Sequence, residues 1–149
     1  MQILFLLICL ATLLLRLAAA DDGGLYYDAA VQIIREKQDY EGAITLLEAA
    51  LKGVIEEGRI SAERRQLLGT CYYKSGRVSE AILELKAAID ILGWESSPSI
   101  IGNYLEALNA ADRTSEALEA SAVALKVHPK YMQVVYNSGV VHQKAKMCH

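Results

Sequence analysis

Proline is scarce in this chain of 149 residues, which contains only Pro98 and Pro129. Proline removes a backbone donor and interrupts helices, so its scarcity leaves long stretches of the chain able to form helices. The sequence after residue 20 is also rich in Ala, Leu, Glu and Lys, which favour helices. The composition therefore predicts an all-α fold, and the length fits one domain of ordinary size.

Basic clusters are absent as well, and the net charge is −3. Proteins that bind nucleic acids or anionic membranes need concentrated Lys and Arg, so neither is an expected partner. The three histidines, His128, His142 and His149, are scattered without partners at metal-ligand spacing. The sequence also has no glycine-rich phosphate loop and no pair of carboxylates suited to acid–base catalysis. We therefore expect a protein that is not an enzyme and that binds neither a metal nor a cofactor.

Only one long apolar run occurs, at residues 3–15. It is shorter than the roughly 20 residues that span a membrane, and the small residues 18–20 before Asp21 suit a cleavage site. Residues 1–20 are therefore predicted to be a secretory signal peptide. The remaining chain, 21–149, would then enter the endoplasmic reticulum lumen or be secreted, without a membrane contact. Because Arg16 follows the apolar run and no basic residue precedes it, an uncleaved membrane anchor is the alternative.

Cysteine is rare, and Cys9 would leave with the signal peptide. Cys71 lies on the apolar face of a predicted helix, where a cysteine most often serves as a small buried apolar residue. A disulfide between Cys71 and Cys148 stays open, because spacing alone cannot establish one.

The segment 66–92, QLLGTCYYKSGRVSEAILELKAAIDIL, predicts two helices joined by a tight turn. Gly76 suits that turn because a residue without Cβ adopts the left-handed conformation easily. The small residues Gly69 and Ala81 would let the two helices approach closely. Apolar residues recur at helical spacing in both: Leu68, Cys71 and Tyr72 in the first helix, and Ala81, Leu85, Ala88 and Leu92 in the second.

This hairpin recurs along the chain. Ala43, Ala81 and Ala117 are 38 and 36 residues apart, and each lies at the same place in a predicted second helix. A period near 34 with two helices per unit is typical of tetratricopeptide repeats, and the chain resembles this family over residues 24–149. The resemblance implies an all-α, right-handed superhelix of antiparallel hairpins. Its units would be 24–57, 62–95, 98–131 and a half unit, 132–149.

The family pattern assigns seven residues to contacts within and between these units. They are Gly69, Tyr72, Ala81, Leu85, Ala88, Ala117 and Gly139. His142 takes the place of the aromatic residue in the half unit and is expected to be partly buried. The tryptophan that the family has in its first helices is missing everywhere in this chain.

In this family the first helices line a concave groove that binds extended peptides. The groove residues that the resemblance implies are Gln66, Thr70, Tyr73, Lys74, Asn103, Tyr136 and Asn137, with Asp28, Gln32, Arg35, Glu63, Glu106, Asn109, Gln143 and Lys144 at further groove positions. Asn103 and Asn137 resemble the asparagine ladder of O-linked N-acetylglucosamine transferases, although both could also be solvated polar residues. Some relatives grip a C-terminal carboxylate with Lys and Asn, but Asp28 and Gln32 occupy those places here, which disfavours that mode.

The resemblance implies a non-enzymatic scaffold or adaptor in the secretory pathway that binds a protein or an extended peptide. An alternative is the substrate-recruiting N-terminal part of a larger secretory-pathway enzyme, such as a glycosyltransferase or hydroxylase. A third possibility is self-association, because the half unit would leave the face around Val135 and Gly139 without a second helix.

Overall fold

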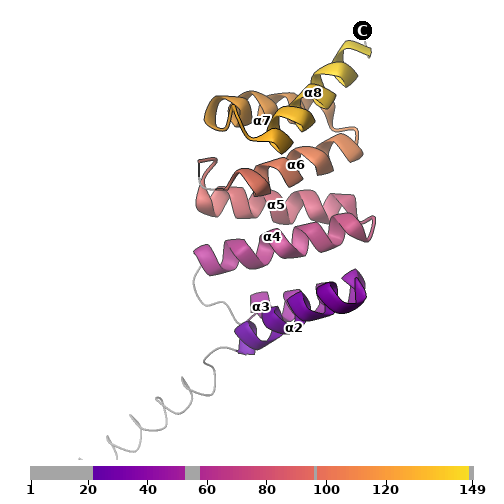
Figure 1. Ribbon diagram of the computed structural model, residues 1–149, viewed down its shortest axis with the longest axis vertical. Helices are drawn as coiled ribbons and strands as arrows, with labels where there is room; N and C mark the ends of the chain where they lie inside the picture. The colour runs from indigo at the N-terminus through magenta and orange to yellow at the C-terminus, as the bar shows by residue number, and fades with distance from the viewer. Residues whose placement is uncertain (1–21, 53–57, 96, 148–149) are drawn as a thin grey trace, which may run out of the picture.

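The computed structural model describes residues 22–52, 58–95 and 97–147. The predicted signal peptide and Cys148 lie outside these ranges. The described residues form seven helices and no strand: α2 (Asp22–Lys37), α3 (Tyr40–Lys52), α4 (Arg59–Lys74), α5 (Val78–Leu92), α6 (Pro98–Ala110), α7 (Thr114–Val127) and α8 (Met132–Met147). They stack in chain order along the long axis of the molecule, with α2 at one end and α8 at the other (Figure 1). The predicted all-α stack of hairpins is confirmed.

Two of the hairpin turns close in the same way. Gly76, with φ of 79°, follows α4, and Asp112, with φ of 55°, follows α6. After α4, the amide of Arg77 donates to the Tyr72 carbonyl at 2.8 Å, and the same bond recurs after α6 between Arg113 and the Leu108 carbonyl at 3.1 Å. This pairing satisfies carbonyls at the helix end and reverses the chain. The left-handed turn predicted at Gly76 is confirmed.

A glycine sets the distance between α4 and α5. A Cβ at Gly69 would lie 2.7 Å from Leu85 Cγ and 3.2 Å from the Ala81 carbonyl oxygen. These distances leave no room for a side chain, so the absence of one at Gly69 allows the two helices to approach closely. Alanines line the second helices, and Ala43, Ala81 and Ala117 are all fully buried.

Polar bonds join one hairpin to the next. Arg64, a buried residue of α4, donates from Nη1 to the Ala50 carbonyl in α3 at 2.8 Å. This bond satisfies a carbonyl in the last turn of α3. The Tyr72 hydroxyl donates to Glu48 Oε1, also in α3, at 2.6 Å. The first two hairpins are therefore connected by directional bonds in addition to apolar contacts.

The buried face of α8 differs from the expected one. The buried residues of this helix are Val134, Asn137, Ser138 and Val141. The family pattern assigned Gly139 to internal contacts and His142 to a partly buried place, but both residues are exposed. The prediction is wrong here because, within the described residues, no second helix covers that face of α8.

The helices of the described ranges include none that is both long enough and apolar enough to cross a membrane.

Candidate functional site

Helices α4, α6 and α8 are the first helices of the second, third and fourth units. Helix α4 contacts α6, and α6 contacts α8. Polar side chains bridge them. Asn103 Nδ2 donates to Thr70 Oγ1 at 3.2 Å, and Gln133 Nε2 donates to Asn103 Oδ1 at 3.0 Å. Gln66 Nε2 adds a bond to Ser99 Oγ at 3.3 Å. These bonds fix the side chains along the inner face of the three helices.

A pocket of about 370 Å³ opens on this face and draws its walls from all three helices. Tyr73 comes from α4, whereas Tyr136 and Lys144 come from α8. The complete lining is Tyr73, Glu106, Asn109, Ala110, Gln133, Tyr136, Asn137, Val140 and Lys144. Six of these nine residues were predicted for the groove. The structure therefore brings residues from units two, three and four into one cavity.

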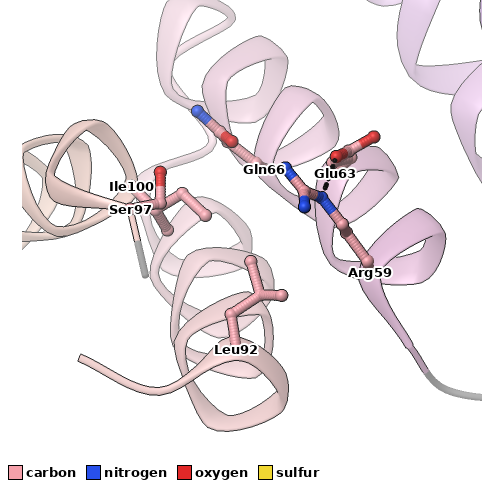
Figure 2. Close-up of a pocket in the computed structure, with 6 residues that line it drawn as sticks. All are labelled: Arg59, Glu63, Gln66, Leu92, Ser97 and Ile100. Carbon is pink, nitrogen blue, oxygen red and sulfur yellow. Dashed lines mark hydrogen bonds and ion pairs between the residues drawn. The ribbon is translucent and has the colours of Figure 1, made fainter. Parts of the chain in front are cut away.

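A second, smaller pocket of about 200 Å³ lies near the first turns of α4 and α6, as shown in Figure 2. Arg59 and Glu63 form an ion pair of 3.0 Å on its α4 side. Leu92 from α5 and Ile100 from α6 face them across the cavity. Gln66, a predicted groove residue, lines this pocket rather than the larger one.

Tyr73 is the aromatic wall of the larger pocket on the α4 side. Burial raises the pKa of its hydroxyl, and the negative charge of Glu106 and a hydrogen bond to that carboxylate raise it further. Tyr73 therefore stays neutral at physiological pH. The Lys74 ammonium, on the exposed last turn of α4, lies 5.7 Å from the centre of the Tyr73 ring, within the range of a cation–π contact.

The two asparagines do not form a ladder of free amides. Asn137 is only 5% exposed, and its Nδ2 donates to the Gly102 carbonyl at 2.9 Å. The backbone carbonyl of Asn137 accepts a hydrogen bond from Asn109 Nδ2 at 3.2 Å. Asn103 is half-buried, its side-chain Nδ2 is hydrogen-bonded to Thr70, and its Oδ1 is hydrogen-bonded to Gln133. Both residues tie neighbouring first helices together, so the expected pair of amides presented to a peptide is not found.

Gln133 is a pocket residue that the sequence reasoning missed. It bonds to Asn103 and also lies against Gly102, where an added Cβ would be 2.7 Å from Gln133 Cδ. The glycine inside a predicted helix was the available clue, because it indicates a close approach by another part of the chain. Nothing in the sequence identified which residue makes that approach.

The first hairpin contributes no residue to the larger pocket. Asp28 and Gln32, the residues in place of the carboxylate-gripping Lys and Asn, are exposed on α2. Gln32 Nε2 donates to Glu36 on the same helix at 3.0 Å.

Nucleophilic and metal-ligating groups are dispersed. Burial raises the pKa of the Cys71 thiol to about 11, so this buried thiol stays protonated at neutral pH. His128 Nε2 pairs with the Trp94 carbonyl at 2.8 Å, and His142 Nδ1 pairs with the Ser138 carbonyl at 2.7 Å. Within the described ranges, no three or more His, Cys, Asp or Glu side chains gather as a metal site would require.

No profile of a known protein family matches the sequence. DnaJ homolog subfamily C member 3 of Gallus gallus is 38% identical to this chain over 73 residues, which cover 49% of the chain and 14% of that protein. The solved structure of YrrB, a tetratricopeptide protein with an unusual peptide-binding site, superposes with a TM-score of 0.71 at 22% identity, over 87% of this chain and 62% of YrrB. The chain therefore spans less than two thirds of either protein.

The second tetratricopeptide domain of human RPAP3, solved in complex with an HSP70 peptide, superposes with a TM-score of 0.68 at 17% identity. This match covers 80% of the chain and 98% of that domain. The stacked hairpins, their left-handed turns and these likenesses agree, and the chain has the all-α superhelical fold of tetratricopeptide repeat proteins.

Proposed function

We propose that this chain is a non-enzymatic scaffold that binds an extended peptide, or an extended segment of a partner protein, along the inner face of α4, α6 and α8. The pocket of about 370 Å³ carries this proposal, because three successive first helices line it. It combines two tyrosine rings with amide and charged side chains, a mixture that suits a peptide with both apolar and polar groups. The peptide-binding site of YrrB and the peptide complex of the RPAP3 domain, both in proteins with the same fold, support this assignment.

Tyr136, whose ring is exposed, is the residue to test first. It is 69% exposed at the edge of the pocket, so Tyr136→Ala removes contact surface without disturbing the core. Probes would be a displayed library of unstructured peptides and the HSP70 peptide found with RPAP3. We expect Tyr136→Ala to lower the affinity for the peptide about tenfold, because a buried aromatic anchor commonly contributes more than 1 kcal/mol to binding. Fluorescence anisotropy of the labelled peptide gives the measurement.

Leu83→Ala is the matched control, because Leu83 is equally exposed, at 67%, but lies on α5 outside the pocket. It should bind the peptide as the unchanged chain does. Amidation of the peptide's C-terminal carboxylate should also leave affinity unchanged, because Asp28 and Gln32 replace the residues that would grip it. The proposal fails if no peptide binds, or if both variants bind equally well.

We also propose that the chain acts in the secretory pathway, on the basis of residues 1–20. Expression of the full chain with a C-terminal tag gives the test. A protein that is protected from protease in sealed microsomes and begins at Asp21 supports the proposal. A protein that is degraded, or that retains residues 1–20 in the membrane, contradicts it.

A further inference from the structure

One face of α8 is uncovered where the same face of α6 is buried. The two helices correspond at a shift of 34 residues, which pairs Asn103 with Asn137. In α6, the residues at the corresponding positions are Ile101, Leu105 and Leu108, with exposures of 1%, 0% and 0%. Their counterparts in α8 are Val135, at 41%, and the exposed residues Gly139 and His142. We refer to Val135, Gly139 and His142 as the open face of α8.

The neighbouring face of α8, about 100° around the helix, is buried. In α6 that face consists of Ile100, Tyr104 and Ala107, and in α8 of Val134, Ser138 and Val141; all six are buried. Helix α8 lies against α6 and α7. It is therefore placed on the preceding hairpin as an ordinary first helix, and the exposure of its open face is not a result of poor attachment to the stack.

The earlier hairpins show what this face accommodates. In α4, the residue that corresponds to Gly139 is Gly69, which lies directly against Leu85 and the backbone of Ala81 in α5. At Gly139 an added Cβ would meet nothing within 4 Å. A glycine at this position admits a helix that carries a small residue at the point of closest approach, and the space for it is vacant among the described residues.

Charge specifies the direction of such a helix. The second helices carry an acidic residue in the first turn, namely Glu41, Glu80 or Glu116. They run antiparallel to the first helices, so this turn comes near the end of the preceding first helix. The last turn is basic in α2 and α4, although not in α6. The last turn of α8 is basic too, with Lys144 and Lys146. Lys144 is bonded to Asp112, which leaves Lys146 as the exposed cation.

Exposed apolar side chains concentrate around the same helix. Of the ten large apolar residues that are exposed in the described ranges, five lie here: Tyr131, Met132, Val135, Tyr136 and Met147. A concentration of this kind on a folded domain marks an interaction surface. Val135 belongs to the open face, and Tyr136 belongs to the pocket.

We propose that the open face of α8 binds an amphipathic helix of a partner protein, antiparallel to α8. The partner helix places an alanine or another small residue over Gly139 and an acidic first turn beside Lys146. This surface is separate from the peptide pocket, which Tyr136 and Lys144 line from the other side of α8. A second copy of this chain fits less well. Its own α8 would bring further lysines, and the alanine stripes of α3, α5 and α7 are buried within their hairpins.

The chain supplies its own probe for the test. A labelled synthetic peptide with the sequence of α5, residues 78–92, carries the required alanines and Glu80 in its first turn. We expect the full-length chain to bind it saturably, and the peptide to gain helical circular dichroism on binding. Glu80→Lys in the peptide should weaken binding at least fivefold.

Gly139→Leu in the protein is the decisive variant. Because nothing lies within 4 Å of an added Cβ at that position, the protein keeps its fold. The new side chain prevents close approach of the peptide helix and should weaken its binding at least tenfold. Ala122→Leu, a similar enlargement at an exposed position of α7, is the control and should have no effect. The inference is overturned if the α5 peptide does not bind. It is overturned equally if the peptide binds Gly139→Leu normally, or is lost only with Tyr136→Ala, which would place it in the pocket.

Sedimentation equilibrium of the chain without peptide tests the remaining candidate for the open face, a second copy of the chain. A monomer across the concentration range agrees with a vacant open face. A dimer that Gly139→Leu dissociates would assign the face to a second copy and overturn the inference.

Discussion

Gly69 and Gly139 hold corresponding positions in α4 and α8 and have opposite surroundings. A Cβ at Gly69 would be 2.7 Å from a carbon of Leu85, whereas a Cβ at Gly139 would meet nothing within 4 Å. In the middle of a helix, glycine is less favourable than alanine by about 0.5–1 kcal/mol because its unfolded backbone is more flexible. The same substitution should therefore have opposite effects at the two positions.

We predict that Gly139→Ala raises the free energy of unfolding by about 0.5–1 kcal/mol, since it gains helix propensity without a clash. Gly69→Ala should lower it by about 1–3 kcal/mol, because the added methyl forces α4 and α5 apart. Urea denaturation followed by circular dichroism measures both. If the two variants shift in the same direction, Gly139 is not in the open environment that the structure describes.

Between elements, Tyr72 connects α4 to α3 through its 2.6 Å bond to Glu48. Burial, followed by the hydrogen bond and charge of Glu48, raises the pKa of Tyr72 to about 12. The Arg77 guanidinium lies 4.5 Å from the ring centre and opposes this shift. A phenol with a raised pKa in the folded state favours folding while it is protonated. This contribution is complete below the ordinary value of 10.0 and is lost as the pH rises towards 12.

Tyr72→Phe should therefore cost about 0.5–1.5 kcal/mol near neutral pH, the usual net value of one hydrogen bond. The difference between the variant and the unchanged chain should shrink between pH 10 and 12. Over this range Tyr72 loses its proton in the unfolded chain, whereas the folded chain must keep that proton to donate to Glu48. Thermal unfolding at a series of pH values gives the measurement. A difference that stays constant up to pH 12 would show that the Glu48 bond is not what Tyr72 contributes.

The sequence predicted the elements well where local residues determine them. Gly76 marks the turn between α4 and α5, and the alanine positions mark the second helices. The register of α8 was harder, because Asn137 and Ser138 on its buried face interrupt the apolar period. Asn137 is bonded in its buried position to the Gly102 carbonyl, 35 residues earlier, and no local pattern records such a contact. The contact between Gln133 and Gly102 was missed for the same reason.

For the whole molecule, the helix pairs in extensive contact are near neighbours in the stack, from α2 with α3 at one end to α8 with α6 and α7 at the other. In such an array each unit is stabilised mainly by itself and its neighbours, so damage at one end should remain local. Leu47 in α3 and Val141 in α8 are both fully buried, one near each end. They allow this property to be tested with core substitutions of the same kind.

We predict that Val141→Ala lowers hydrogen-exchange protection in α8 and its contacts α6 and α7, and leaves α2 and α3 unchanged. Leu47→Ala should do the reverse, with a local cost of about 2–5 kcal/mol that the smaller valine truncation does not reach. Native-state exchange followed by mass spectrometry resolves the helices. If either substitution lowers protection equally from α2 to α8, the stack unfolds as one unit. Binding at the open face of α8 would then also stabilise the distant first hairpin, whereas local unfolding confines that stabilisation to the last helices.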